Sequence, residues 1–254
     1  MRSRVRVPLN LDANIVVKLA STPEERAGAF KVLHDAYVDM GFCQPQPNGM
    51  RTVPHHSLPR TPIIIAKDGD KVVGTLTLAD DETLDLPLEK SWTLDRYRAG
   101  NGKVLEVTCF AIERSYRRCN NKNVFFPLIQ FMYQFASSVL EADYLVIATH
   151  PKVRDFYEGV LFFDPIDTRV IEDYIGAPAI AMSLELKHLP LKYLNVYGKR
   201  PSDQNLYSYF VDYRVVDTAA AYVSEGLATD LDFDSAKIKP PYPSPAFELE
   251  TPRS

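Results

Sequence analysis

The chain has 254 residues, and its composition of 46% hydrophobic and 24% charged residues is ordinary for a soluble globular protein. Its formal net charge of −4 excludes a global basic field that would recruit nucleic acid or an anionic membrane. Three cysteines without a CxxC pair argue against a disulfide framework, and the five scattered histidines offer no metal-ligand spacing. Because there is no signal-peptide pattern and no run of about 18 apolar residues, we expect a cytoplasmic protein without a membrane span.

The first predicted elements are a strand over 15–19 and a helix that starts after Thr22. Thr22 suits the N-cap position, and Glu25 suits the closure of a capping box. Gly41 is suited to end this helix. The face at helical spacing consists of Arg26, Phe30, Leu33, Tyr37 and Met40. Because a buried guanidinium needs a partner, Arg26 either keeps its head group in solvent at the helix end or has a structural or substrate-pairing role.

Residues 43–61 form a long irregular segment with four prolines and two histidines. Loops of this length inside compact domains are usually functional or disordered. A β-hairpin follows, with strands over 62–67 and 71–78 joined at Asp68-Gly69-Asp70. Residues 80–101 are predicted to be a polar connection.

The rest of the predicted domain alternates strand and helix. It comprises strands over 103–112, 144–149 and 178–186 and helices over 123–140 and 153–160. This order indicates an α/β (α+β) fold, with a mixed sheet covered by helices on both faces. Beyond residue 188, weak helical patterns over 206–212 and 218–225 lead to a proline-rich tail, which we expect to be extended or disordered.

The predicted strand over 103–112 carries one carboxylate, Glu106, in apolar surroundings. Regular alternation would place Glu106 on one face with Val104, Thr108, Phe110 and Ile112. Burial would raise its pKa and suit it to accept a proton from an incoming ammonium group. The alternative is a structural ion pair with Arg26. Cys109 should point into the other layer, and we do not propose it as a nucleophile because no base is placed for it.

Six short motifs occur in order along residues 14–188. They are Arg26-Ala-Gly-Ala-Phe30, Leu58-Pro-Arg-Thr61, Val73-Gly-Thr-Leu-Thr-Leu78, Leu105-Glu-Val before Phe110-Ala-Ile112, His150-Pro-Lys with Phe156-Tyr157, and Ala177-Pro-Ala-Ile180. Together they resemble the GNAT acyltransferase superfamily, and more closely the FeeM-type long-chain N-acyl amino acid synthases, which are relatives of the homoserine-lactone autoinducer synthases. The resemblance implies a GNAT-like N-acyltransferase domain over 14–188. Residues 189–254 would form a C-terminal helical extension and proline-rich tail.

The resemblance also implies three catalytic residues. Glu106 would be the base, and Tyr157 the general acid that protonates the departing pantetheine thiolate. His150 would relay a proton or bind substrate. The alternatives are that Tyr157 is a core tyrosine with its hydroxyl at the surface and that His150 is structural.

Two binding sites are implied in the same way. The acyl and pantetheine site would contain Thr108, Phe110, Ala111, Ile112, Arg117, Arg118 and Asn120, and the acceptor site Arg26, Phe30, Tyr37 and Arg60. Backbone N–H groups around Phe110 and Ala111 would be the oxyanion and pantetheine donors if a β-bulge is present. Arg60 would pair with a substrate carboxylate or, alternatively, anchor its own loop.

The sequence departs from the family pattern at two turns. Acetyl-CoA-using relatives wrap the pyrophosphate with a glycine-rich turn, whereas residues 117–123 contain no glycine. An acyl carrier protein presents phosphopantetheine without the adenosine diphosphate, and a basic cluster would steer this acidic partner. The cluster is Arg114, Arg117, Arg118 and Lys122, and the alternative is that these are solvated loop charges. Leu161-Phe-Phe163 stands where relatives have Leu-Gly-Phe, which would shift the turn after Tyr157.

These observations predict an enzyme that transfers a long-chain fatty acyl group from acyl carrier protein to the α-amino group of an amino acid by direct attack. No cofactor would be permanently bound, and acyl-phosphopantetheine would be the donor substrate. The alternatives are an acyl-CoA- or acetyl-CoA-dependent transferase of the same fold and a non-catalytic module that binds acyl lipid or carrier protein. The long-chain interpretation predicts an apolar channel that meets Glu106 and the Phe110–Ala111 edge, partly covered by residues 43–61.

Overall fold

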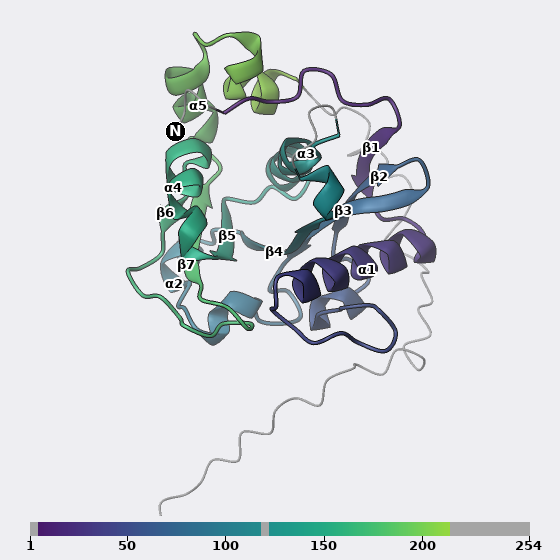
Figure 1. The fold of residues 1–254 in the computed structure, drawn as a ribbon. Coiled ribbons are helices and arrows are strands. Elements are labelled where there is room, and N and C mark those ends of the chain that lie inside the picture. The colour runs from purple at the N-terminus through teal and green to yellow at the C-terminus, as the bar shows by residue number, and fades with distance from the viewer. Residues whose placement is uncertain (1–4, 118–121, 214–254) are drawn as a thin grey trace, which may run out of the picture.

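The computed structural model describes residues 5–117 and 122–213, which form a seven-stranded sheet with helices on both faces (Figure 1). The strands are β1 Ile15–Leu19, β2 Ile63–Asp68, β3 Lys71–Ala79, β4 Val104–Ile112, β5 Tyr144–Thr149, β6 Asp164–Pro165 and β7 Ile180–Glu185. The helices are α1 Pro23–Asp39, α2 Asp95–Arg98, α3 Phe125–Ser138, α4 Arg154–Phe156 and α5 Leu189–Tyr197. The predicted mixed α/β architecture is confirmed.

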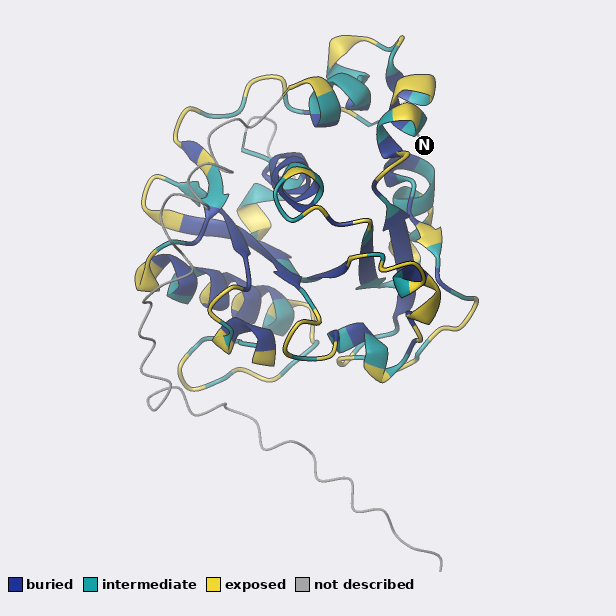
Figure 2. Cartoon of the chain, turned by 180° about the vertical axis from the view of Figure 1, so that it is seen from behind, coloured by how far each residue is buried: buried dark blue, intermediate teal, exposed yellow. Residues whose placement is uncertain are grey.

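The strand order is β1-β2-β3-β4-β5-β7-β6, and β4 with β5 is the parallel pair in it. Helix α1 covers one face of the sheet and α3 covers the other (Figure 1). The core beneath α1 includes Phe30, Leu33 and Ile65, and the core beneath α3 includes Leu128 and Phe131. Figure 2 shows the central strands almost entirely buried, with exposed residues on the outer sides of the helices.

Helix α1 begins as predicted, but its capping box forms only in part. The Thr22 hydroxyl accepts a hydrogen bond from the Glu25 N–H at 3.2 Å. The Glu25 carboxylate accepts from the Ser21 N–H at 2.9 Å and pairs with Lys18 and Lys67, each at 3.0 Å. Burial acts to raise the pKa of Glu25, but these partners outweigh it and hold the pKa at about 2. The two lysines project from β1 and β2, so this carboxylate joins the helix start to the sheet.

The prediction that residues 80–101 form a polar connection is wrong. This segment contains a 3₁₀ turn over Pro87–Lys90 and helix α2, and it buries Leu86, Leu88, Trp92 and Leu94. These side chains form a third core with Val104 and Val146 from β4 and β5. The apolar residues are spaced irregularly because they sit on short turns, so no helix or strand period appears in the sequence.

The predicted helix over 153–160 consists of three short pieces. A 3₁₀ turn over Pro151–Val153 leads into α4, and a π-helical turn covers Tyr157–Leu161. Phe162 then adopts the left-handed conformation, with φ of 62°. This is the position where a glycine was expected, and a phenylalanine there is strained. Phe162 therefore has the left-handed backbone that a glycine adopts readily.

The ring of Phe162 packs on the C-terminal extension. Its centroid lies 5.1 Å from that of Tyr193 and 5.9 Å from that of Tyr197, both in α5. The Tyr197 hydroxyl donates to the carbonyl of Val160 at 3.3 Å. Because this aromatic packing includes both α5 and the π-helical turn, it offsets the strain at Phe162.

Residues 189–213 share a core with α3. Tyr193, Tyr197 and Phe210 belong to the same buried cluster as Phe131. The domain boundary at 188 stays a prediction, and the helix expected over 218–225 and the proline-rich tail lie outside the described residues. No helix in the described part of the chain has the length and apolar character needed to cross a membrane.

The left-handed conformation predicts an unusual order of stability at position 162. Phe162→Ala removes the ring and keeps a Cβ in the strained conformation, whereas Phe162→Gly removes the ring and the strain. We expect the glycine variant to be more stable than the alanine variant by about 1 kcal/mol, the reverse of the usual ranking. Urea denaturation of both variants measures this difference. An alanine variant as stable as the glycine variant, or more stable, would contradict the structure at this turn.

Candidate active site

The candidate site lies where β4 and β5 separate. The two strands pair only over Val104–Glu106 and Tyr144–Val146. β4 then continues beside β3 to Ile112, while β5 continues beside β7 to Thr149. A cavity of about 250 Å³ lies at this divergence and is lined by both strands.

A β-bulge in β4 shapes one wall of this cavity. Thr77 pairs with Thr108 and Thr75 pairs with Ala111, so a step of two residues in β3 matches a step of three in β4. Cys109 takes up the extra residue with a φ of 55°. Neither Cys109 nor Phe110 has a partner in the β3–β4 register, which frees their backbone groups from regular strand pairing.

The bulge reverses the alternation of side chains. Before it, Leu105 and Val107 face α3, and Glu106 faces the other side of the sheet. After it, Phe110 packs on the α3 side with Phe125, and Cys109 joins the core beneath α1. The prediction that Phe110 and Ile112 share a face with Glu106 is therefore wrong. The prediction that Cys109 lies on the face opposite Glu106 is also wrong, because both residues lie on the α1 side. One inserted residue moves every following side chain to the other face.

Glu106 is 2% exposed. Its carboxylate accepts a hydrogen bond from the N–H of Leu88 at 2.8 Å. Burial raises the pKa of Glu106 to about 8, opposed by the Leu88 N–H, while the nearby Glu89 adds to the rise and Lys90 reduces it. Arg26 is not among these groups, and it donates instead to the carbonyl of His56 at 2.8 Å. The hydrogen-bond partner of the buried carboxylate is thus the N–H of Leu88, and not Arg26 as in the alternative ion pair.

The cavity extends to both sides of the sheet through the gap between β4 and β5. Its walls on the α3 side are apolar and consist of Val107, Phe110, Ile129, Met132, Ile147, Leu161 and Phe163. On the side of α1 it meets Glu106, Cys109, Tyr37 and Tyr174. A long apolar group on one side can thus approach a titratable carboxylate on the other.

Tyr157 and His150 line the cavity from the β5 side. Burial raises the pKa of the Tyr157 phenol, and the Thr149 hydroxyl opposes this, so the phenol stays protonated at neutral pH. The His150 Nδ1 accepts from the N–H of Lys152 at 3.1 Å. In a neutral imidazole this bond leaves the ring proton on Nε2. The cavity lining thus includes a protonated phenol and an imidazole whose Nδ1 is already an acceptor.

The structure brings together some of the predicted site residues and not others. Glu106, Thr108, Phe110, Tyr37, His150 and Tyr157 line the cavity, whereas Arg26, Phe30, Arg60, Ala111, Ile112 and Arg117 do not. Phe30 stacks on His56 in the core beside α1, with ring centroids 4.7 Å apart. Arg60 is exposed, and Arg117 donates to the carbonyl of Ile112 at 2.7 Å. Arg118 and Asn120 lie outside the described residues.

The cavity has a cover that differs from the predicted one. Residues 43–61 contribute no lining residue, and the cover comes from Met40, Phe42 and the loop over 174–179. Gly176 has a φ of 85°, and a Cβ at this position would lie 2.5 Å from the carbonyl oxygen of Phe42. A glycine is therefore required where the two covering segments touch. Tyr174 was missed because nothing in its local sequence indicates that this loop folds back over β4.

The described residues contain no group of three histidine, cysteine, aspartate or glutamate side chains that would hold a metal ion. Cys109 lines the cavity, but burial raises the pKa of its thiol to about 12. The other lining side chains that carry exchangeable protons are Glu106, His150 and the phenols of Tyr37, Tyr157 and Tyr174.

Comparisons with known proteins agree with this geometry. A family model described as N-acyl amino acid synthase FeeM matches residues 28–185. The structure of FeeM, an N-acyl amino acid synthase from uncultured soil microbes, is similar at 23% identity and a TM-score of 0.61, over 70% of this chain and 93% of that one. No curated protein sequence matches this chain.

Two further structures share the fold. The CoA-dependent acyl-homoserine lactone synthase BjaI matches at 16% identity and a TM-score of 0.53, over 74% of this chain and 92% of that one. An N-acetyltransferase from Staphylococcus aureus Mu50 matches at 17% identity and a TM-score of 0.50, over 69% of this chain and 100% of that one. At these identities the likeness shows a GNAT-like fold.

The raised pKa of Glu106 predicts a pH dependence of stability. The folded state keeps the proton up to a pH of about 8, whereas an ordinary glutamate releases it near 4.5. The free energy of unfolding contributed by this group therefore falls as the pH rises through this interval. Glu106→Gln lacks the titration, so we expect its stability relative to the wild type to increase from pH 5 to pH 9 in urea denaturation. The exposed Glu82→Gln is the control, and its stability should follow that of the wild type at every pH. A difference in the free energy of unfolding between Glu106→Gln and the wild type that stays constant from pH 5 to pH 9 would show that the pKa of Glu106 is not raised.

Proposed function

Because this chain belongs to the FeeM N-acyl amino acid synthase family and is an N-acyltransferase, we propose that it transfers a long-chain fatty acyl group from acyl carrier protein to the α-amino group of an amino acid. The observation that carries the proposal is the cavity between β4 and β5, in which apolar walls meet the buried Glu106. We place the reaction in the bacterial cytoplasm, where acyl carrier protein and free amino acids are available.

The apolar lining of the cavity supports a long acyl chain. Ligand pockets commonly measure about 300–1,000 Å³, and this cavity, at about 250 Å³, approaches that range. An acetyl group would bury a single methyl group there. A chain of a dozen carbons gains about 0.8 kcal/mol for each CH₂ that it buries, so the apolar walls favour a long donor.

The arrangement of proton-exchanging groups supports direct attack. Glu106 takes a proton from the incoming ammonium group and passes it to solvent, and the freed amine attacks the thioester carbonyl. The C–N bond forms, the C–S bond breaks, and Tyr157 protonates the departing thiolate. The phenolate regains a proton from the nitrogen of the new amide. We propose His150 as a substrate contact beside Tyr157, and the backbone around Phe110 as the site that stabilises the oxyanion.

The turn after β4 supports carrier protein rather than CoA as the donor. Arg114 is exposed, and Arg117 closes the turn through the carbonyl of Ile112. Lys122 pairs with Asp68 at 2.7 Å, so its charge is partly neutralised. We propose that Arg114 and Arg117 meet the acidic carrier protein, whereas the glycine-free turn offers no bare backbone to wrap a pyrophosphate.

A donor comparison tests this function. Purified protein is given acyl carrier protein and CoA loaded with the same acyl groups, from acetyl to palmitoyl, with a mixture of amino acids, and N-acyl products are measured by mass spectrometry. We expect turnover with long-chain acyl carrier protein, and much less with matched acyl-CoA or with acetyl donors. Equal or better activity with acyl-CoA would contradict the carrier-protein donor, a preference for acetyl groups would contradict the long chain, and no product from any donor would favour a non-catalytic binding module.

A further inference from the structure

The acceptor must reach Glu106 from the side of the sheet that α1 covers. Glu106 faces that side, whereas Phe110 and the other apolar walls lie on the α3 side. If the chain acylates an amino acid, as proposed above, the acyl group and the acceptor therefore enter the gap from opposite faces. The acceptor would lie among Tyr37, Cys109 and Tyr174.

An amino acid in this position brings a carboxylate with it. The carboxylate is bonded to the same carbon as the amine, so it must be accommodated close to the buried Glu106, which repels it when ionised. A cation is needed on this side to hold it. The described lining of the cavity contains no lysine or arginine. A cation that holds this carboxylate would therefore stand behind the lining residues.

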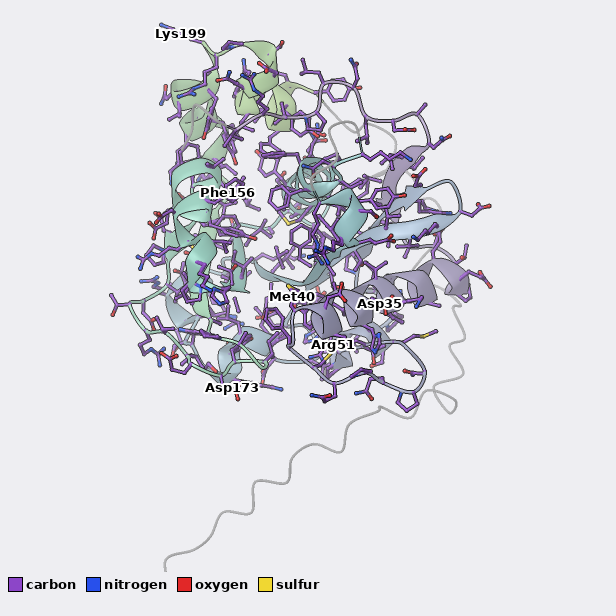
Figure 3. All side chains as sticks on the ribbon, in the orientation of Figure 1. Asp35, Met40, Arg51, Phe156, Asp173 and Lys199 are labelled. Carbon is purple, nitrogen blue, oxygen red and sulfur yellow. The ribbon has the colours of Figure 1, made fainter. Side chains whose placement is uncertain are left out.

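Arg51 stands behind the lining residue Tyr37, on the acceptor side of the cavity. Its backbone N–H donates to the carbonyl of Phe30 at 3.1 Å, which fixes the loop alongside α1. Its guanidinium carbon lies 4.9 Å from the centroid of the Tyr37 ring. Its positive charge acts on Tyr37 and Cys109, two residues that line the acceptor side of the cavity. Figure 3 shows Arg51 beside α1 in the region of Met40, another residue of the cavity cover.

The charge of Arg51 is available for a ligand. No carboxylate in the described part of the chain forms an ion pair with it, and Asp35 on the adjacent helix is paired with Lys31 and His34. Arg51 is also partly buried, which strengthens its attraction for an anion relative to an exposed arginine. Its planar fork matches a carboxylate, and stacking on Tyr37 limits the orientations it can adopt.

We propose that Arg51 binds the α-carboxylate of the acceptor amino acid, with the Tyr37 ring as the platform that orients its guanidinium. This assigns to Arg51 the role that the sequence assigned to Arg60. Neither arginine lines the cavity, but Arg51 is partly buried against the lining residue Tyr37, whereas Arg60 is exposed. Lys90 is the rival cation because its charge acts on Glu106, but it is exposed and lies on the 3₁₀ turn that covers β4 and β5.

The test compares two acceptors that differ only in this carboxylate. The wild-type enzyme is first screened with the twenty amino acids, and the best acceptor is then compared with its own α-carboxamide. For Arg51→Gln we expect the KM for the amino acid to rise roughly 10- to 100-fold, the loss of one charge-assisted hydrogen-bonded pair. The KM for the carboxamide should change little, so the preference for the acid disappears. Arg51→Lys should retain part of that preference because it keeps the charge without the fork.

Three results would overturn the assignment to Arg51. Equal losses with the acid and the carboxamide would make Arg51 a support for Tyr37 only. If Lys90→Gln lost the preference for the amino acid over its carboxamide while Arg51→Gln kept it, Lys90 would be the residue that binds the carboxylate. The same loss in the control Arg60→Gln would restore the role to Arg60. A wild-type enzyme that acylates no amino acid would instead contradict the proposed function, which separates the two failures.

Discussion

The parallel pairing of β4 with β5 stops after Glu106, and the cavity exists because it stops there. Beyond this point each strand stays paired with its antiparallel neighbour, so neither can close the gap. The bulge at Cys109 then turns Phe110 toward α3, so the gap has an apolar side and a side with a carboxylate. A thioester held in the gap would have its acyl chain and its attacking amine on opposite faces of the sheet.

Glu106 is buried at the last paired position, and the segment over 86–97 explains how this is tolerated. Leu88 supplies the hydrogen bond to the carboxylate, and Leu86, Trp92 and Leu94 exclude water around it. One hydrogen bond from a neutral N–H does not compensate for full burial of a charge, so the proton is held more tightly than in water. In the proposed reaction, the loss of solvation that destabilises the ionised form would let this group act as a base near neutral pH.

Much of the fold could be predicted from the sequence, because local signals determine it. Thr22 at the helix start, the turn at Gly69 and the buried Glu106 were all evident from residue types and spacing. The face of the sheet that each β4 side chain from Cys109 onward occupies could not be predicted, because a bulge without glycine does not alter the alternating pattern in the sequence. The position of Arg51 depends on where a long loop returns along α1, a tertiary contact that no periodicity records.

The pH dependence of turnover in the wild type and in Glu106→Gln tests most directly whether this carboxylate is the base. With a saturating acyl donor, wild-type kcat/KM for the acceptor should rise with pH toward an apparent pKa near 8, because Glu106 must be ionised to act. Glu106→Gln should be about 10²-fold or more slower and should lack that rise. A folded Glu106→Gln enzyme with near-normal turnover and the same pH profile would show that Glu106 only supports the structure.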